Sequence, residues 1–191
     1  MVLALCSLVQ FSARPLFADT AGGKVAKPGA QAALKSGAAI GHGVEALPRA
    51  VAEMRETILE AVRSGRIEDL RIAIELNELR PELGAAPGSD PIAHLKSLSA
   101  DGEGRDILAV LGELLEGGYA VIPAGPDIEN NRVYVWPYFA EVPLGTLNPV
   151  QEVELYRLVP ANEVRAMRAA GKWSWWRLAI GAAGTWLSFG R

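Results

Sequence analysis

From Val44 onward, apolar residues recur at three- and four-residue steps, which is the spacing of an amphipathic helix. The first helical segment opens at Pro48 and stops at Ser64-Gly65, where serine and glycine are typical of a helix end. The second segment follows at once and ends near Arg80. It is apolar on two sides, so we expect it to be sandwiched between other elements. Together the two segments predict an antiparallel helical hairpin.

A third helix is predicted over residues 107–115, because the apolar residues there keep the same spacing and Gly117-Gly118 follow them. Between the helical hairpin and this helix, residues 84–104 are rich in glycine, proline, serine and aspartate, which is typical of a loop. A short helical turn is expected inside that loop, over residues 92–98. The first part of the domain is therefore predicted to be helical.

Beyond Gly118 the pattern changes to that of β-strands. Residues 119–125 and 130–139 carry β-branched and aromatic residues, and a polar, turn-rich link joins them. Pro137 has no N–H to donate, so the second strand is expected to end there or to lie at a sheet edge. These two runs predict a β-hairpin.

The last third of the chain predicts two short helices and a second hairpin. Pro149 and Pro160 each stand where a helix can begin without losing a hydrogen bond. Residues 172–190 hold two further strand-like runs about a short alanine-rich turn. The order of three helices, a hairpin, two helices and a hairpin indicates an α+β fold with helices packed on an antiparallel sheet.

The N-terminal region has a different composition. Residues 1–18 resemble a secretory signal peptide, because an apolar stretch comes first and the small residue Ala18 precedes a polar run. The alternative is a strand or helix broken at Pro15. Residues 19–43 are rich in alanine and glycine without any aromatic residue, which predicts a flexible tether. Residues 44–191 are then expected to form a single α+β domain.

Charge and composition exclude several classes of protein. The chain of 191 residues has a net charge of −3 and no run of lysine or arginine, so nucleic acid is not an expected partner. No stretch approaches the roughly 18 uninterrupted apolar residues of an integral membrane segment. The single cysteine, Cys6, lies in the predicted signal peptide, so no disulfide, cysteine-ligated zinc or cysteine nucleophile is expected after cleavage. No cofactor is predicted.

Four of the five tryptophans fall near the C-terminus. Strand alternation would place Trp176 on an apolar face that points to the core, and Trp173, Trp175 and Arg177 on the opposite face. A guanidinium among indole rings can stack sugar rings or planar groups. That opposite face is therefore a candidate binding surface, and the alternative is that helices cover it.

The extent of this surface depends on the register of the last hairpin. If Ile180 pairs with Thr185, which we favour, Trp186 joins the candidate surface. A three-residue loop would shift the register by one and send Trp186 to the core face instead. Tyr134 and Trp136 share one side of their own strand and are expected to extend the aromatic cluster.

A weaker alternative is a metal site before the third helix, formed by His94, Asp101, Glu103 and Asp106. Carboxylates can hold calcium, and histidine with carboxylates can hold zinc. The spacing matches no established metal motif, however. The other interpretation is a helix entrance, with Ser99 or Asp101 as its cap and acidic residues in the first turn.

Three aromatic blocks carry a family resemblance: RVYVWPYFAEVPL, EVELYRLVP and WWRLAIGAAGTWLSF. With them, residues 99–189 resemble an uncharacterised family of exported bacterial proteins, which implies a location in the bacterial envelope. That family carries Asp before Gly-Thr-Trp, where this chain has Ala183, so the last turn differs. The order of elements is also similar to NTF2-like and cystatin-like folds, in which helices pack into the concavity of a curved sheet.

These observations lead to the hypothesis of an exported, non-catalytic binding or scaffolding protein of the periplasm. It would use the aromatic face or an adjoining pocket, and its partner would be an envelope protein or a glycan. No catalytic residue is predicted, because His42 lies in the tether and no nucleophile motif accompanies His94. Two alternatives stay open: an enzyme acting on an envelope substrate, and a structural protein that assembles into a homo-oligomer.

Overall fold

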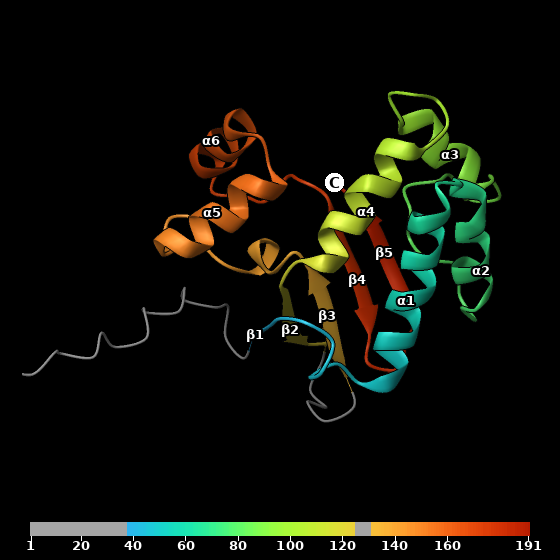
Figure 1. Cartoon of the computed structure of the whole chain (residues 1–191), viewed down its shortest axis with the longest axis horizontal. Helices are drawn as coiled ribbons and strands as arrows, with labels where there is room; N and C mark the ends of the chain where they lie inside the picture. Colours follow the sequence, from blue (N-terminus) through green and yellow to red (C-terminus); the bar gives the residue numbers. More distant parts are fainter. Residues whose placement is uncertain (1–37, 125–130) are drawn as a thin grey trace, which may run out of the picture. The chain divides into compact units, whose positions relative to one another are not determined.

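The computed structural model describes residues 38–124 and 131–191 (Figure 1). The predicted signal peptide, residues 1–18, and residues 19–37 of the predicted tether lie outside the described residues. The α-helices of the described part are α1 Arg49–Ser64, α2 Leu70–Glu75, α3 Pro91–Leu98, α4 Arg105–Glu116, α5 Pro149–Leu158 and α6 Ala161–Ala170. Its strands are β1 Ala39–Gly41, β2 Tyr119–Pro123, β3 Arg132–Trp136, β4 Arg177–Gly181 and β5 Trp186–Gly190.

The five strands form one antiparallel sheet in the order β1-β2-β3-β4-β5. Both predicted hairpins are present, as β2 with β3 and β4 with β5, so the predicted α+β fold is confirmed. The end of the predicted tether needs a correction. Ala39–Gly41 pair with β2 as an edge strand, with Ile40 opposite Ala120. The likeness to NTF2-like or cystatin-like folds stays a prediction.

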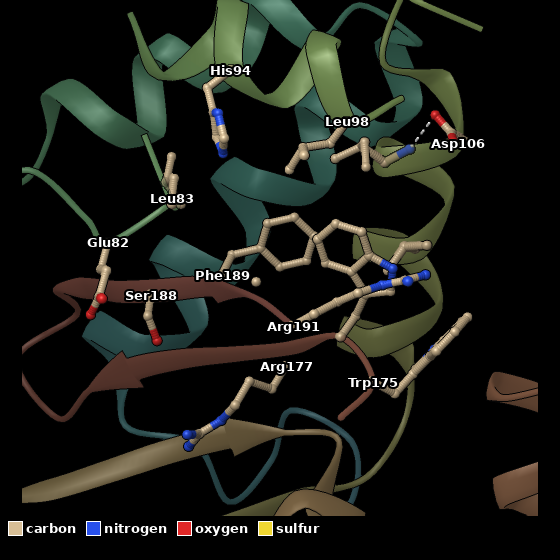
Figure 2. A pocket seen from close by; sticks show the side chains of 15 residues that line it. Glu82, Leu83, His94, Leu98, Asp106, Trp175, Arg177, Ser188, Phe189 and Arg191 are labelled. Carbon is tan, nitrogen blue, oxygen red and sulfur yellow. Dashed lines mark hydrogen bonds between the residues drawn. The ribbon is translucent and has the colours of Figure 1, made fainter. Parts of the chain in front are cut away.

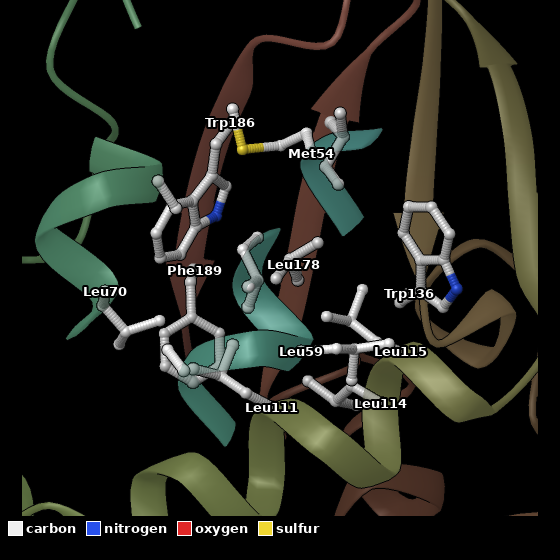
Figure 3. Packing of buried hydrophobic residues seen from close by; sticks show 14 of the residues in the cluster. Met54, Leu59, Leu70, Leu111, Leu114, Leu115, Trp136, Leu178, Trp186 and Phe189 are labelled. Carbon is white, nitrogen blue, oxygen red and sulfur yellow. The ribbon is translucent and has the colours of Figure 1, made fainter. Parts of the chain in front are cut away.

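Helices α1 and α4 pack against one face of this sheet (Figure 1). The apolar stripe that the sequence predicted on α1 is buried there, including Val51, Met54 and Ile58. Figure 3 shows how this core is filled from the helices and from the sheet. Its labelled members are Met54, Leu59, Leu70, Leu111, Leu114, Leu115, Trp136, Leu178, Trp186 and Phe189.

The second predicted helix is shorter than expected. A 3-10 turn, η1 (Ile67–Asp69), leads into α2, which ends at Glu75 rather than near Arg80. Asn77 follows it: its Nδ2 donates to the Ala73 carbonyl at 2.8 Å and its Oδ1 accepts from the Trp186 backbone N–H at 2.7 Å. The second apolar stripe of this segment is solvent-exposed, both within α2 and beyond its end, so the prediction that it is sandwiched is wrong. The exposed residues are Ile72, Leu76 and Leu79.

The opposite face of the sheet carries a second, smaller core. A 3-10 turn, η2 (Tyr138–Glu141), follows β3 directly and packs near β2 and β3. Together with α5 and α6 it buries an apolar cluster beside Ala120 of β2. The other buried members are Tyr138, Phe139, Val142, Leu144, Leu155, Val159, Val164 and Met167. Apolar packing therefore reaches both faces of the sheet.

The register of the last hairpin differs from the one that the sequence favoured. The Gly181 N–H donates to the Thr185 carbonyl at 2.9 Å, which closes a three-residue loop. Gly184 takes a left-handed conformation in that loop, with φ of 85°, which glycine adopts at no steric cost. Ile180 then pairs with Trp186, and a bulge follows. The predicted register is therefore wrong, and Trp186 points into the core.

Candidate functional site

A cavity of about 640 Å³ lies between α3, α4, the end of β5 and the segment before β4 (Figure 2). Its apolar lining consists of Leu83, Leu98, Ile107, Val110, Trp175, Trp176 and Phe189. Polar and charged groups border it as well: Glu82, His94, Asp106, Arg177, Ser188 and Arg191. These residues come from two distant parts of the chain, 82–110 and 175–191. Only folding brings them together.

Trp175 and Trp176 lie in the segment that leads from α6 to β4. The sequence predicted a strand from residue 172, but the strand begins only at Arg177, so strand alternation does not govern these side chains. The Trp176 ring is 7% exposed and stacks on Phe189, with ring centroids 4.9 Å apart and planes 14° apart. Its predicted place in the core is confirmed. Trp175 is half-buried and packs against the cores on both faces of the sheet.

Two guanidinium groups border the cavity, and they differ in whether a carboxylate pairs with them. Arg177 donates from Nη2 to Oε1 of the buried Glu141 at 3.1 Å, so its charge is partly compensated. Arg191 lies over the indoles, with Cζ 4.4 Å from the Trp175 ring centroid and 5.0 Å from that of Trp176. Within residues 38–124 and 131–191, no ion pair joins Arg191 to a carboxylate. Cation–π contacts with the two indoles hold this guanidinium.

A second cavity of about 560 Å³ lies near η2 and the end of α6, and Trp173 and Arg177 border it. Trp173 stacks on Phe139 with ring centroids 6.4 Å apart. The indole Nε1 of Trp173 and the Nε of Arg177 are buried without a hydrogen-bond partner among the described residues. Because protein atoms cover both groups, neither presents a donor to this cavity as it stands. The larger cavity is therefore the better candidate site.

The structure separates the aromatic residues that the sequence grouped into one site. Trp173 borders the second cavity, whereas Trp175 borders the first, and Arg177 lies at both. Trp186, Tyr134 and Trp136 are buried in the helix-covered core. For Trp186 the reason is the three-residue loop of the last hairpin. Tyr134 and Trp136 lie on the sheet face that α1 and α4 cover.

The four residues of the weaker metal alternative do not converge. In the described part of the chain, no group of three or more His, Cys, Asp or Glu side chains is placed to hold a metal ion. His94 borders the cavity, and Glu103 lies 3.8 Å from the Lys96 ammonium. Asp101 Oδ1 instead accepts from the backbone N–H groups of Glu103 and Gly104, at 2.8 and 2.9 Å.

The acidic residues of this segment organise the entrance of α4. The Ser99 hydroxyl lies within hydrogen-bond distance of both Asp101 and Asp106. Asp106 also accepts from the backbone N–H groups of Ala100 and Ile107, both at 3.0 Å. The Ser99 hydroxyl and the backbone N–H groups hold the pKa of Asp101 well below its ordinary value. The cap residue of α4 is Gly104, without a side-chain cap hydrogen bond, so neither Ser99 nor Asp101 is the cap; Asp106 does lie in the first turn, as predicted, and Asp101 holds the loop before the helix.

A third, smaller cavity of about 280 Å³ is bordered by His42, Tyr138 and Glu154. His42 was predicted to lie in the tether, but it follows β1 and its ring contacts Tyr138 edge-on, with centroids 5.8 Å apart. The Tyr138 hydroxyl donates to Glu154 Oε2 at 2.8 Å. Burial, and then this hydrogen bond to Glu154, raise the pKa of Tyr138 far above its ordinary value. Tyr138 therefore stays protonated and acts as a fixed donor.

Sequence reasoning missed Phe189 and Arg191 as members of the site. Both lie at alternate positions at the end of the last strand-like run, so they share one side of it. That alternation was a usable signal, but the favoured register directed attention to Trp186 instead. His94 was noticed only as a metal ligand, because nothing in the sequence shows that α3 faces the C-terminal tryptophans.

Comparison of the chain with protein-family models, with curated proteins and with solved structures found no match. The resemblance to exported bacterial proteins therefore stays a prediction. Among the helices of residues 38–124 and 131–191, none is long and apolar enough to cross a membrane. The cavity between α3, α4 and β5 is therefore the main indication of function.

Proposed function

We propose that this protein is a non-catalytic binding protein of the bacterial periplasm that takes a small amphipathic ligand. The observation that carries the proposal is the cavity of about 640 Å³ walled by Trp175, Trp176 and Phe189. Small-molecule sites in proteins are concave, mostly apolar and usually about 300–1,000 Å³ in volume. The cavity has this size and this chemistry.

The walls supply two kinds of contact. The exposed part of Trp175 offers an indole on which a planar group or a sugar ring can stack, and such contacts contribute roughly 0.5–1.5 kcal/mol each. Leu98, Ile107 and Val110 offer aliphatic surface. Trp176 and Phe189 are already stacked on each other, so this wall is formed before any ligand arrives. A preformed wall lowers the entropic cost of binding.

Two of the charged groups at the cavity already make contacts that stabilise the fold. Arg177 is paired with Glu141, and Asp106 accepts hydrogen bonds that organise the entrance of α4. General acid–base chemistry needs a titratable group that can exchange a proton with the substrate. These two residues are engaged in structural contacts instead. An enzyme acting on an envelope substrate and a self-assembling protein stay predictions.

Nuclear magnetic resonance of the indole N–H groups tests the proposal on the whole chain. Three planar probes with one naphthalene body are titrated separately: 2-naphthoate, 2-naphthylmethanol and 2-naphthylmethylamine. We expect at least one probe to shift the indole signals of Trp175 and Trp176 in a saturable manner. The signal of Trp136, which is 1% exposed in the core, should not move. No saturable shift with any of the three probes would refute the proposal.

A pair of matched variants locates the binding site. Trp175→Ala removes the stacking surface of the cavity and is expected to weaken probe binding roughly threefold to tenfold. Trp173→Ala removes the same kind of side chain from the second cavity and should leave binding unchanged. Equal losses in both variants would show that binding does not take place in the proposed cavity.

A further inference from the structure

We infer that the cavity selects ligands that carry a carboxylate, with Arg191 as the group that recognises it. This inference rests on the proposed function and names the chemical class of its ligand. A guanidinium presents a rigid fork of N–H donors that matches the two oxygens of a carboxylate. Arg191 borders the cavity and brings such a fork to its aromatic end (Figure 2).

Arg191 is solvent-exposed, and its contacts with two indole rings favour one position of its guanidinium before a ligand arrives. Its guanidinium carbon lies 4.4 Å from the centroid of Trp175 and 5.0 Å from that of Trp176. Contacts with two rings restrict a side chain that otherwise has many rotamers. Cation–π contacts use the face of the guanidinium, so its N–H edges stay available for an acceptor. The N–H donors of Arg191 are therefore partly ordered in the free protein, which lowers the entropic cost of binding a ligand.

The two guanidinium groups at this end of the cavity differ in their ion pairing, and the carboxylate of Asp106 is held by neutral donors. Arg177 pairs with Glu141 at 3.1 Å. Asp106 accepts two backbone N–H groups and lies within hydrogen-bond distance of the Ser99 hydroxyl. Within the ranges 38–124 and 131–191, Arg191 has no carboxylate partner. An anionic ligand would supply the missing counter-charge.

Two further titratable groups face the cavity. Glu82 is exposed and lies at the end away from Trp175 in Figure 2, so water screens its repulsion of an anion. His94 projects from α3 into the cavity between Leu83 and Leu98 (Figure 2). Its imidazole can add a second N–H donor for the ligand. Because Glu82 and Asp106 are anionic, the preference for a carboxylate rests on the guanidinium fork of Arg191 beside the tryptophans and not on the net charge of the cavity.

The rest of the cavity defines the body of the ligand. Beyond Arg191, the side chains of Leu98, Ile107, Val110 and Phe189 give the cavity an apolar part. A charged head at the guanidinium would leave the apolar part of the ligand against these side chains. The ligand class is therefore an apolar or planar carboxylic acid, in which one end is ionised and the other is buried.

The three naphthalene probes test this inference, because they share one body and differ only in the head group. Wild-type protein should bind 2-naphthoate about tenfold more tightly than 2-naphthylmethanol, since a charge-assisted hydrogen bond contributes at least that factor. The amine should bind more weakly than the alcohol. Binding of all three with equal affinity would overturn the inference and leave the proposed function standing. Binding of none would refute both.

Variants assign the preference to one side chain. Arg191→Gln should lower the carboxylate-to-alcohol affinity ratio to about one while leaving the affinity for the alcohol unchanged, because only the charged fork is lost. Arg165→Gln is the matched control, since Arg165 is exposed on α6 and does not border the cavity. It removes the same net charge and should keep the tenfold ratio. A ratio that survives Arg191→Gln, or one that Arg165→Gln abolishes equally, would overturn the role of Arg191. Unchanged indole signals of Trp136 and Trp186, which are buried in the core and do not border the cavity, verify that each variant is folded.

Discussion

Replacing Gly104 with alanine is expected to destabilise the domain for two reasons: the backbone conformation disfavours any side chain, and the added Cβ would clash with Ile67. Gly104 precedes the first turn of α4 and has φ of 86°, in the left-handed region. An alanine in that conformation costs about 1–2 kcal/mol. The added Cβ would also lie 2.3 Å from Cδ1 of Ile67 and 2.8 Å from its Cβ, which is far inside van der Waals contact.

The neighbouring side chain cannot move away at low cost. Ile67 is 0% exposed and belongs to the helix-covered core, so its displacement would disturb close-packed residues. Overpacking of this kind costs about 1–3 kcal/mol. With the backbone cost, the expected loss for Gly104→Ala is about 2–5 kcal/mol in the free energy of unfolding.

Gly102→Ala is the matched control in the same loop. Gly102 also has a left-handed conformation, with φ of 67°, but no atom lies within 4 Å of the position that a Cβ would take. This variant should lose only the backbone cost of about 1–2 kcal/mol. The difference between the two alanine variants therefore isolates the clash with Ile67.

Urea denaturation followed by tryptophan fluorescence measures both variants. The midpoint should fall further for Gly104→Ala than for Gly102→Ala, with the same dependence of free energy on urea. Adding Ile67→Val to Gly104→Ala removes Cδ1, the atom nearest to the new Cβ. The double variant should therefore lose less free energy of unfolding than the sum of the losses of the two single variants. Equal destabilisation of the two glycine variants would show that the close approach of Gly104 to Ile67 is not a feature of the fold.

Two further predictions concern the last hairpin and the entrance of α4. Trp186→Ala should lower the free energy of unfolding, measured by urea denaturation, by about 3–5 kcal/mol because this side chain is 0% exposed. Leu187→Ala, at the neighbouring residue that is 39% exposed, should lower it far less. A larger loss in Leu187→Ala would support the register that the structure contradicts. The pKa of Asp101 is lowered on folding, first by the Ser99 hydroxyl and then by backbone N–H groups, so its stabilising effect is complete above the ordinary aspartate pKa of about 4 and is lost as the pH falls below it. In Ser99→Ala the free energy of unfolding should therefore fall less steeply than in the wild type as the pH is lowered below about 4. Equal slopes in the variant and the wild type would contradict the role of the Ser99 hydroxyl.

Local patterns were enough to predict most of the secondary structure. The stop at Ser64-Gly65, the helix over 107–115 and the helices opened by Pro149 and Pro160 are all present within a few residues. Helix and strand periodicity are set by backbone geometry, and a single helix or strand shows them in its own sequence. The predicted end of the second helix was wrong, because the chain after it is held by Asn77, which accepts a hydrogen bond from Trp186 more than one hundred residues later.

The candidate site was predictable only in part. Trp175 and Arg177 were singled out from the sequence, and both border the cavity. Trp186 was misplaced because one residue in the loop length inverts every side chain of a strand, and the sequence alone did not decide that length. Phe189 and Arg191 were missed because nothing in the sequence shows that the end of this strand lies opposite α3 and α4.

The sequence by itself determined most of the helices and the two hairpins, since each of these elements shows its period in its own spacing of apolar residues. Only the tertiary structure decided which residues share a cavity. It packed α3 and α4 opposite the end of β5, and it placed Arg191 over Trp175 and Trp176. The physical reason is that a cavity forms from side chains far apart in the chain, whose meeting depends on loop lengths and packing that no local pattern records.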